Sequence, residues 1–560
     1  MIGILLDQKL EKYKQSIDYT FKYIFNTLGY EYRYIESLTQ LSENDLLFCY
    51  ALVYPTESEM KWISEGRPAI FCKAEEEFYQ FSFERQDLPN LILKSIKKLT
   101  VFSNEKNKEP FIQRMFDNNY YGQINFDLIA NVFFSLVSYE EHRYGKKDEL
   151  GRFDDRENIL FKDKYTTRVT HLTELLNDFI VLSIKKNERY IVRKNYWPKN
   201  EDYALLISHT INRLKKWSFK NLILDILKDL KFLILFKFRA FGSLFKDLFL
   251  FILEDIEPYW CFESFINLDK KFGLKATYFF ADNSNIKDNE IDYSLDDKDV
   301  VKIIELLSKE GNEISLLIDY LDTKTQQSIN KHLTNLSKIV NKQVQGYRVM
   351  NNKIDLGKQL ISHVESNAKY CSNWSYNTSN GFKNGVTFPF KPLIEDKEVN
   401  HKMWFVPVSF SDTKLWFDEI SNISYDEAKE MIIKLHKNLM KNNGVFSLEI
   451  SSSNFVDIPY ADQLVNYIYE LEKSSNIYKV THSELIDWWE KRLKVRIAEA
   501  KNYFKIYFPE KLADFSVTIT STKNIIDIKG NCKSVLKNNV IHFSGIESKS
   551  EVFVYFEDKE

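Results

Sequence analysis

The most constraining feature of this chain is a strand, helix, strand rhythm that begins near residue 202 and recurs along the central part of the sequence. Tyr203–Ser208 and Ala276–Phe280 are short apolar runs typical of strands. Between them, Trp260–Phe272 has helical spacing and stops before Gly273. Because alternation of this kind builds parallel sheets, we expect a parallel sheet in this region, either open or closed into a barrel.

The same unit recurs further along the chain. Asp297–Lys309 has helical spacing and precedes the strand-like run Glu313–Ile318. Ser424 and Glu427 have the spacing of a capping box, and the helix that they open precedes the strand-like run Val445–Ile450. The central domain is therefore predicted to be α/β throughout.

The regions on either side of this rhythm have different patterns. Before residue 195, helical patterns such as Ile17–Leu28 and Leu172–Leu182 mix with short apolar runs such as Leu46–Val53. After Arg496 the helical pattern ends, and four short strands are predicted at Phe515–Thr520, Ile525–Ile528, Val540–Phe543 and Glu551–Tyr555. We therefore expect an N-terminal α/β domain at 1–195, a central domain at 196–492 and a small β-rich module at 493–560.

Charge and cysteine usage exclude several classes of protein. Lys and Arg number 77 against 80 Asp and Glu, so the net charge of −3 provides no bulk field for nucleic acid. The five cysteines are scattered and never form a CxxC pair, which argues against a disulfide framework and against a cysteine-rich zinc site. The first residues lack the basic start and the cleavage site of a secretory signal, so we expect a cytoplasmic protein.

The stretch 221–253 is the most apolar part of the chain, but charged residues interrupt it too often for a transmembrane span. Its apolar residues recur at helical spacing with lysines between them. Two alternatives remain open, which are contact with a membrane surface and helices that cover the central domain. The second alternative is favoured.

Seven strings of the central region carry a family resemblance by their order. They are LLISHTINRLKKW (Leu205–Trp217), EPYWCFESFINLDKKFGLKATYFF (Glu257–Phe280), GNEISLLIDY (Gly311–Tyr320), VQGYRV (Val344–Val349), YCSNWSYNTSNGFKNGVTFPFKPL (Tyr370–Leu393), NNGVFSLEISSSNF (Asn442–Phe455) and THSELIDWW (Thr481–Trp489). Together they resemble bacterial members of the polysaccharide deacetylase superfamily, carbohydrate esterase family four. Thr20–Arg33 and Val137–Asn158 resemble the domain that precedes the barrel in one branch of that family. The resemblance implies a distorted (β/α) barrel with its pocket at the C-terminal ends of the strands.

The resemblance also implies a chemistry that this sequence cannot supply. In the family, a divalent metal activates a water while an aspartate acts as base and a histidine as acid. Here Thr210 stands at the base position, Asn212 at a metal carboxylate, Leu317 at a metal histidine and Ser451 at the acid histidine. We therefore expect no metal or other cofactor, and no intact catalytic residue.

Strand parity predicts where the remaining polar residues of these motifs point. Thr210 and Asn212 share the pocket-facing side of their strand, whereas His209 points to the helix layer. Glu449 lies two residues before Ser451 and should face the barrel interior, where an isolated carboxylate is costly. Arg348, which matches the arginine of the third family motif, is the best candidate for its partner. The alternative is a register shifted by one residue, which would leave Glu449 in solvent.

Further pocket candidates follow the strands or flank them. Asp319 and Asp322 lie just past a strand end, where they could bind a sugar hydroxyl or a metal, although solvated loop acids are the favoured interpretation. Trp374, Tyr376 and Phe388 could stack on sugar faces, with core packing as the default.

Three functions remain open from the sequence. The leading one is a catalytically degenerate protein that binds a saccharide or a partner protein in bacterial surface-polysaccharide assembly. The second is a hydrolase with a site rebuilt from Asp319, Asp322, Glu449, Arg348 or His209, which a strongly perturbed carboxylate in the pocket would favour. The third is a structural assembly subunit, which a barrel mouth filled by its own side chains would favour.

Overall fold

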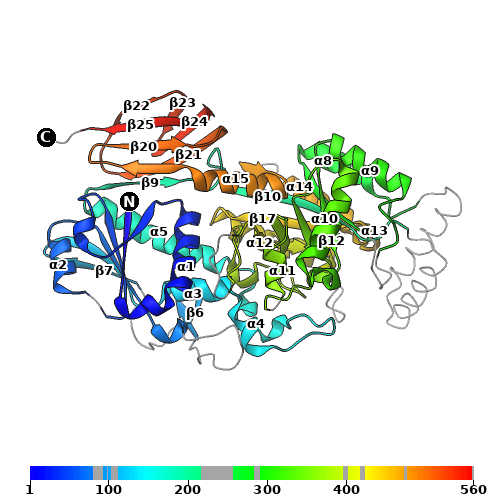
Figure 1. The fold of residues 1–560 in the computed structure, drawn as a ribbon, viewed down its shortest axis with the longest axis horizontal. Coiled ribbons are helices and arrows are strands. Elements are labelled where there is room, and N and C mark those ends of the chain that lie inside the picture. The colour runs from blue at the N-terminus through cyan, green and yellow to red at the C-terminus, as the bar shows by residue number, and fades with distance from the viewer. Residues whose placement is uncertain are drawn as a thin grey trace.

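A computed structural model describes most of the chain (Figure 1). The described residues are 1–53, 55–79, 93–96, 99–102, 111–215, 257–282, 291–357, 359–394, 401–415, 423–471 and 476–557. The amphipathic stretch 221–253 lies outside them. Over the described residues, no helix is both long and apolar enough to cross a bilayer.

A parallel sheet forms the centre of the molecule. Its order is β15-β14-β13-β12-β11-β10-β17-β16, with β18 beside β10. The strands are β10 (Tyr203–Ile211), β11 (Ala276–Ala281), β12 (Glu313–Ile318), β13 (Gly346–Val349), β14 (Tyr370–Trp374), β15 (Trp404–Pro407), β16 (Phe410–Ser411), β17 (Val445–Ser451) and β18 (Ile477–Lys479). Every residue of β10 is buried, as expected for a parallel strand covered on both faces.

One short segment joins the two edges of this sheet. Only two residues separate β15, which pairs with β14, from β16, which pairs with β17. Within that link, the Val408 N–H donates to the Trp374 carbonyl and the Ser409 N–H donates to the Ser447 carbonyl, both at 3.0 Å. The sheet therefore curls round on itself, and the predicted fold class, a distorted (β/α) barrel with α/β and β additions, is confirmed.

Helices cover the outer face of the curled sheet (Figure 1). They are α8 (Phe262–Phe272), α9 (Lys298–Lys309), α10 (Gln326–Val340), α11 (Leu360–Val364), α12 (Tyr425–Met440), α14 (Ala461–Leu471) and α15 (His482–Lys494). The short helix α13 (Ser452–Asp457) directly follows β17. The capping box predicted at Ser424 and Glu427 is present at the start of α12. The helices predicted at 260–272 and 297–309 begin and end within two residues of the observed α8 and α9.

The N-terminal region forms a second, mostly parallel sheet in the order β2-β1-β3-β4-β8-β7. Its strands are β1 (Ile2–Leu6), β2 (Tyr32–Ile35), β3 (Leu46–Ala51), β4 (Ala69–Lys73), β7 (Phe111–Phe116) and β8 (Asn119–Ile124). Alternate residues of β3 serve two apolar clusters, with Phe48 and Tyr50 in the main core and Leu47 and Cys49 in a smaller one. Nearby elements are α1 (Lys14–Leu28), α2 (Glu57–Ser64), α3 (Leu128–Leu136), α4 (Tyr139–Tyr144), α5 (Arg168–Lys186) and the hairpin β5 (Leu93–Ile96) and β6 (Leu99–Phe102).

The C-terminal strands form two antiparallel sheets that lie above the N-terminal sheet in Figure 1. One sheet is β19-β20-β25-β22 and the other is β23-β24-β21-β9. Their bounds are β9 (Tyr190–Lys194), β19 (Arg496–Glu499), β20 (Tyr503–Phe508), β21 (Leu512–Ser521), β22 (Ile525–Gly530), β23 (Lys533–Lys537), β24 (Val540–Ile546) and β25 (Ser550–Phe556). The four predicted strands are present, but β9 comes from before residue 195 and completes the second sheet.

A buried arginine of α15 connects the three parts. Arg492 is fully buried and donates to the carbonyls of Asn26 and Thr27, at the end of α1, at 2.7 and 3.0 Å. The same guanidinium donates to the carbonyls of Lys194 and Asn195, at the end of β9, at 3.0 and 2.6 Å. Since no carboxylate in the described part of the chain pairs with it, burial lowers the pKa of Arg492 to about 9.

We expect Arg492→Met to destabilise the protein by about 3 kcal/mol or more, because several buried carbonyls lose a donor at ~1–3 kcal/mol each. Urea denaturation followed by circular dichroism measures the change. Arg496→Met is the matched control, since Arg496 is exposed on β19 and its loss should cost less than ~0.5 kcal/mol. Equal stability of the two variants would show that the Arg492 contacts do not join the three parts.

Candidate functional site

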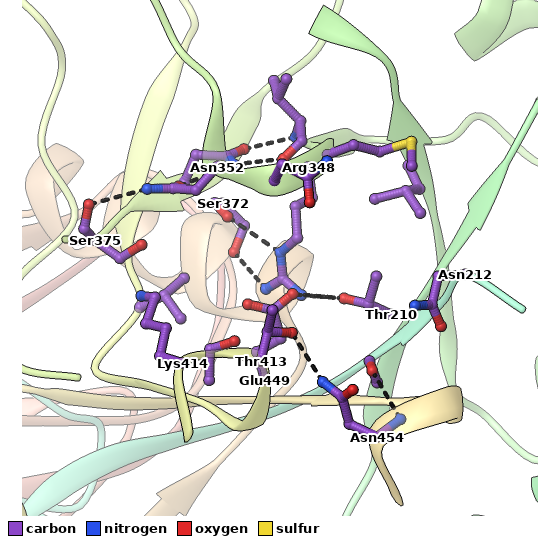
Figure 2. A pocket seen from close by; sticks show the side chains of 18 of the residues that line it. Thr210, Asn212, Arg348, Asn352, Ser372, Ser375, Thr413, Lys414, Glu449 and Asn454 are labelled. Carbon is purple, nitrogen blue, oxygen red and sulfur yellow. Dashed lines mark hydrogen bonds and ion pairs between the residues drawn. The ribbon is translucent and has the colours of Figure 1, made fainter. Parts of the chain in front are cut away.

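A cavity of about 480 Å³ opens at the C-terminal ends of the barrel strands (Figure 2). Most of the side chains that line it are amides, hydroxyls or charged groups. The polar lining residues include Arg152, Thr210, Asn212, Arg213, Arg348, Asn352, Ser372, Asn373, Ser375, Asn377, Ser411, Thr413, Lys414, Glu449, Ser451, Ser453, Asn454 and Asp457. The apolar side chain of Leu317 also lines the cavity.

The guanidinium of Arg348 lies at the base of this cavity and contacts several strands. It donates to Thr210 Oγ1 at 2.9 Å, to Ser208 Oγ at 3.0 Å and to Ser372 Oγ at 3.0 Å. Its plane also lies over the ring of Phe279, 4.2 Å from the centroid. Arg348 therefore links β13 to β10, β14 and β11 through a single side chain.

Glu449 is the counter-ion of Arg348. A carboxylate oxygen of Glu449 lies 3.2 Å from the guanidinium and accepts a hydrogen bond from Thr210 Oγ1 at 2.7 Å. Burial on its own would raise the pKa of Glu449, but the charge of Arg348 and the bond from Thr210 outweigh burial and hold that pKa below its ordinary value. The expected pairing is therefore present, and the alternative register with Glu449 in solvent is excluded.

All four positions at which the sequence departs from the family motifs line the cavity. They are Thr210, Asn212, Leu317 and Ser451. The metal that the resemblance implies does not fit them, because Leu317 offers no lone pair. The oxygen of Asn212 accepts from Ser452 Oγ at 3.1 Å, and its amide nitrogen donates to a neighbouring serine. Within the described ranges, no three His, Cys, Asp or Glu side chains are grouped so as to hold a metal ion.

Asp412 was not predicted as part of the site. It lies directly behind the cavity wall, where it accepts from the Ser451 N–H at 2.8 Å and from the Asn454 amide at 3.2 Å. Burial raises the pKa of Asp412 to about 7, against these hydrogen bonds and with a smaller contribution from the charge of Glu449. The polar run after the apolar segment 404–411 is the sequence signal that could have found it.

Lys414, two residues further on, lines the cavity and was also not predicted. It is 7% exposed, and burial lowers its pKa to about 8 although the charge of Glu449 opposes this shift. Figure 2 shows Lys414 on the Ser375 side of the cavity, across from Asn212.

Asparagines form the wall at the ends of β13 and β14. The Asn373 amide donates to the Asn352 oxygen at 3.2 Å, and the Asn352 amide donates to the Asn377 oxygen at 2.8 Å. A segment of the N-terminal region closes this wall from outside, since Arg152 donates to the Asn351 carbonyl at 2.7 Å. The cavity therefore includes a residue from outside the predicted barrel domain.

Asp319 and Asp322 are not among the residues that line the cavity. Asp319 accepts a hydrogen bond from the Leu321 N–H at 2.7 Å and caps a short 3-10 helix. Its carboxylate is therefore bound to a backbone donor. Asp322 lies 3.5 Å from His332 Nε2 on the helical side of the sheet. The prediction that these two aspartates are pocket residues was therefore wrong. The chain enters a 3-10 helix directly after β12 and turns away from the cavity.

The three aromatic candidates belong to the core rather than to the cavity. Trp374 packs edge-on against Phe390, and Tyr376 packs against Phe161. Phe388 is fully buried and stacks on Trp489. The default interpretation of these aromatics was therefore right, and none of the three offers a face to a sugar.

His209 points away from the cavity, as parity predicts. Its ring stacks on Phe265 of α8 with centroids 3.9 Å apart, and its Nε2 lies 3.8 Å from Asp269. A histidine in this layer cannot reach a ligand in the barrel mouth, so His209 has a packing role.

The charge pair can be tested by a double-mutant cycle. Arg348→Met alone should destabilise the protein by roughly 3–5 kcal/mol, because Glu449 is then left buried without its counter-ion. Glu449→Gln in the same background should recover part of this loss, which urea denaturation measures. A coupling energy of zero would contradict the pair.

The pKa of Asp412 predicts a pH dependence of stability. Because its folded pKa of about 7 exceeds its unfolded value, the stability that this group contributes is fully present at low pH and is lost as the pH rises through 7. Relative to Asp412→Asn, the unfolding free energy of the natural protein should fall by about 2–3 kcal/mol between pH 5 and 8. A difference that stays constant over this interval would show that Asp412 is ionised throughout.

Comparisons with known proteins give a partial family match and a set of distant structures. The model of a family of unknown function, DUF7033, matches residues 7–180, less than half of the chain. No protein of curated function matches the sequence.

Three solved structures illustrate the distant likeness. A Mycobacterium smegmatis protein assigned as a polysaccharide deacetylase is 12% identical with a TM-score of 0.33, over 55% of this chain and 96% of that one. Puue allantoinase is 12% identical with a TM-score of 0.34, over 53% of this chain and 92% of that one. A CE4 family pseudoenzyme from Bacillus anthracis is 8% identical with a TM-score of 0.26, over 52% of this chain and 66% of that one. At these values the likenesses carry no argument about activity, and the barrel assignment rests on the strand order and register of this chain.

Proposed function

We propose that this chain binds a saccharide in the cavity at the barrel mouth and does not deacetylate it. The observation that carries the proposal is the chemistry of the cavity wall, which presents amides and hydroxyls in fixed orientations. Such groups match the alternating donors and acceptors of sugar hydroxyls. On the family resemblance alone, we also propose that the protein acts in the cytoplasm, in bacterial surface-polysaccharide metabolism.

The positions of Thr210, Asn212, Leu317 and Ser451 support the absence of family chemistry. Each lines the cavity where the family has a base, two metal ligands or an acid. Loss of general acid–base participation alone costs about 10²–10⁴ in rate. With the metal ligands missing as well, we expect family-type turnover to be negligible.

The open volume of the cavity supports ligand binding over a purely structural role. A barrel mouth filled by its own side chains would favour an assembly subunit, whereas about 480 Å³ remains between the side chains here. This volume is in the range of sites for small molecules and single sugar units.

A rebuilt hydrolase is the second candidate, because one carboxylate by the cavity is strongly perturbed. The pKa of Asp412 is raised to about 7 while that of Glu449 is lowered, a separation that acid–base pairs often show. However, both Asp412 oxygens already accept hydrogen bonds, and Asp412 is not among the lining residues. Binding therefore remains the better supported function.

Calorimetric titration with a panel of neutral and acidic methyl glycosides tests the proposal. Thr413→Trp should weaken binding at least tenfold, because the indole would occupy space at the cavity wall. Thr334→Trp on the exposed face of α10 is the matched control and should bind like the natural protein. The absence of binding to every glycoside would contradict the proposal.

The catalytic part is tested on the same preparations. Elemental analysis should find no stoichiometric divalent metal, and N-acetylglucosamine oligomers should release no acetate. The combined variant Thr210→Asp, Asn212→Asp, Leu317→His and Ser451→His should gain metal binding, whereas each single change should not. Acetate release by the natural protein that a chelator abolishes would instead favour the rebuilt hydrolase.

A further inference from the structure

One cation on the cavity wall has no partner within the described part of the chain. Lys414 follows the segment 404–411 that closes the barrel, is 93% buried and lines the cavity. Among the described residues, no hydrogen bond or ion pair involves its ammonium group. The charges that act on it do so from a distance and belong to Glu449, Asp155, Arg152 and Arg348.

The other charges on the cavity wall are already matched. Arg348 pairs with Glu449 at 3.2 Å, and Arg152 pairs with Asp148 at 2.7 Å. Asp457 accepts from the Tyr259 hydroxyl at 2.7 Å. The carboxylate of Asp155, which is not among the lining residues, accepts hydrogen bonds from the backbone N–H groups of residues 377 and 378.

Arg213 is the remaining cation and differs from Lys414 in its surroundings. Its guanidinium is only half-buried and lies over the Tyr259 ring, 5.1 Å from the centroid. Burial raises the pKa of the nearby Asp292 carboxyl, and the charge of Arg213 is one of the smaller effects that oppose this shift. Among the described cations that line the cavity, Lys414 is therefore the buried one without a counter-ion.

We propose that Lys414 binds the carboxylate of an acidic saccharide, a hexuronic acid unit, in this cavity. The inference rests on the proposed saccharide function and adds the class of sugar. A buried ammonium without a counter-ion is costly, and a ligand carboxylate supplies one through a charge-assisted hydrogen bond. The paired carboxylate of Glu449 is then available to accept from a ring hydroxyl.

The charge of the cavity favours a carboxylate over a phosphate. One ammonium matches one negative charge, whereas a phosphate monoester carries about −1.5 to −2 at neutral pH. The surplus negative charge would lie in the same cavity as Glu449 and would be repelled by it. A sugar phosphate is therefore expected to bind more weakly than the corresponding uronic acid.

The experiment compares matched sugars on the full chain at pH 7 by titration calorimetry. The probes are the methyl glycosides of glucuronic and galacturonic acid, the neutral methyl glucoside and galactoside, and glucose 6-phosphate. At least one uronide should bind about ten- to hundredfold more tightly than its neutral parent. Lys414→Met should abolish that preference, and Lys414→Arg should retain most of it.

Lys324→Met is the control, since it removes an equal charge from an exposed position. Equal affinity for uronide and neutral parent would overturn the inference and leave the saccharide function standing. Tighter binding of the sugar phosphate would overturn the choice of carboxylate, and absence of binding to every sugar would overturn both proposals. Should Lys414→Met fail to fold, the comparison of the sugars on the natural protein decides.

Discussion

A single buried guanidinium holds the interior of the barrel together. Arg348 reaches from β13 to hydroxyl groups on β10 and β14 and to the carboxylate of Glu449 on β17, while its plane covers Phe279 of β11. A guanidinium presents its donors in one rigid plane, so the strands around it must supply acceptors at fixed positions. The strand ends that form the cavity are therefore held at defined distances from one another.

This arrangement explains why the cavity suits binding better than the chemistry that the family resemblance implies. Thr210 stands where an ionised base would be needed. Its hydroxyl accepts a hydrogen bond from Arg348 and donates one to Glu449. The polar wall is satisfied largely by its own neighbours, with Lys414 as the cation left for a ligand among the described residues. Under the proposed function, a barrel mouth of this kind would recognise hydroxyls and a negative charge without activating water.

Much of the fold was predictable because the strand and helix periods of the central region are clear and their caps can be read locally. The segment 404–411 was missed because it is short and pairs with two different strands, a property that only the closed sheet reveals. Lys414 was missed for the same reason, because its position at the cavity depends on how the segment 404–411 joins the two edges of the sheet. Glu449 was predictable from strand parity, whereas the orientation of Trp374 and Asp319 depended on tertiary packing and on a local backbone cap.

The most direct test of this account is a crystal structure of the protein grown with a saturating methyl uronide and with zinc present in the solution. The account predicts electron density for one sugar in the cavity, with its carboxylate at the Lys414 ammonium and a ring hydroxyl at Glu449, and no anomalous zinc peak between Thr210, Asn212 and Leu317. A zinc ion bound at those three residues, or a sugar bound only outside the cavity, would contradict it.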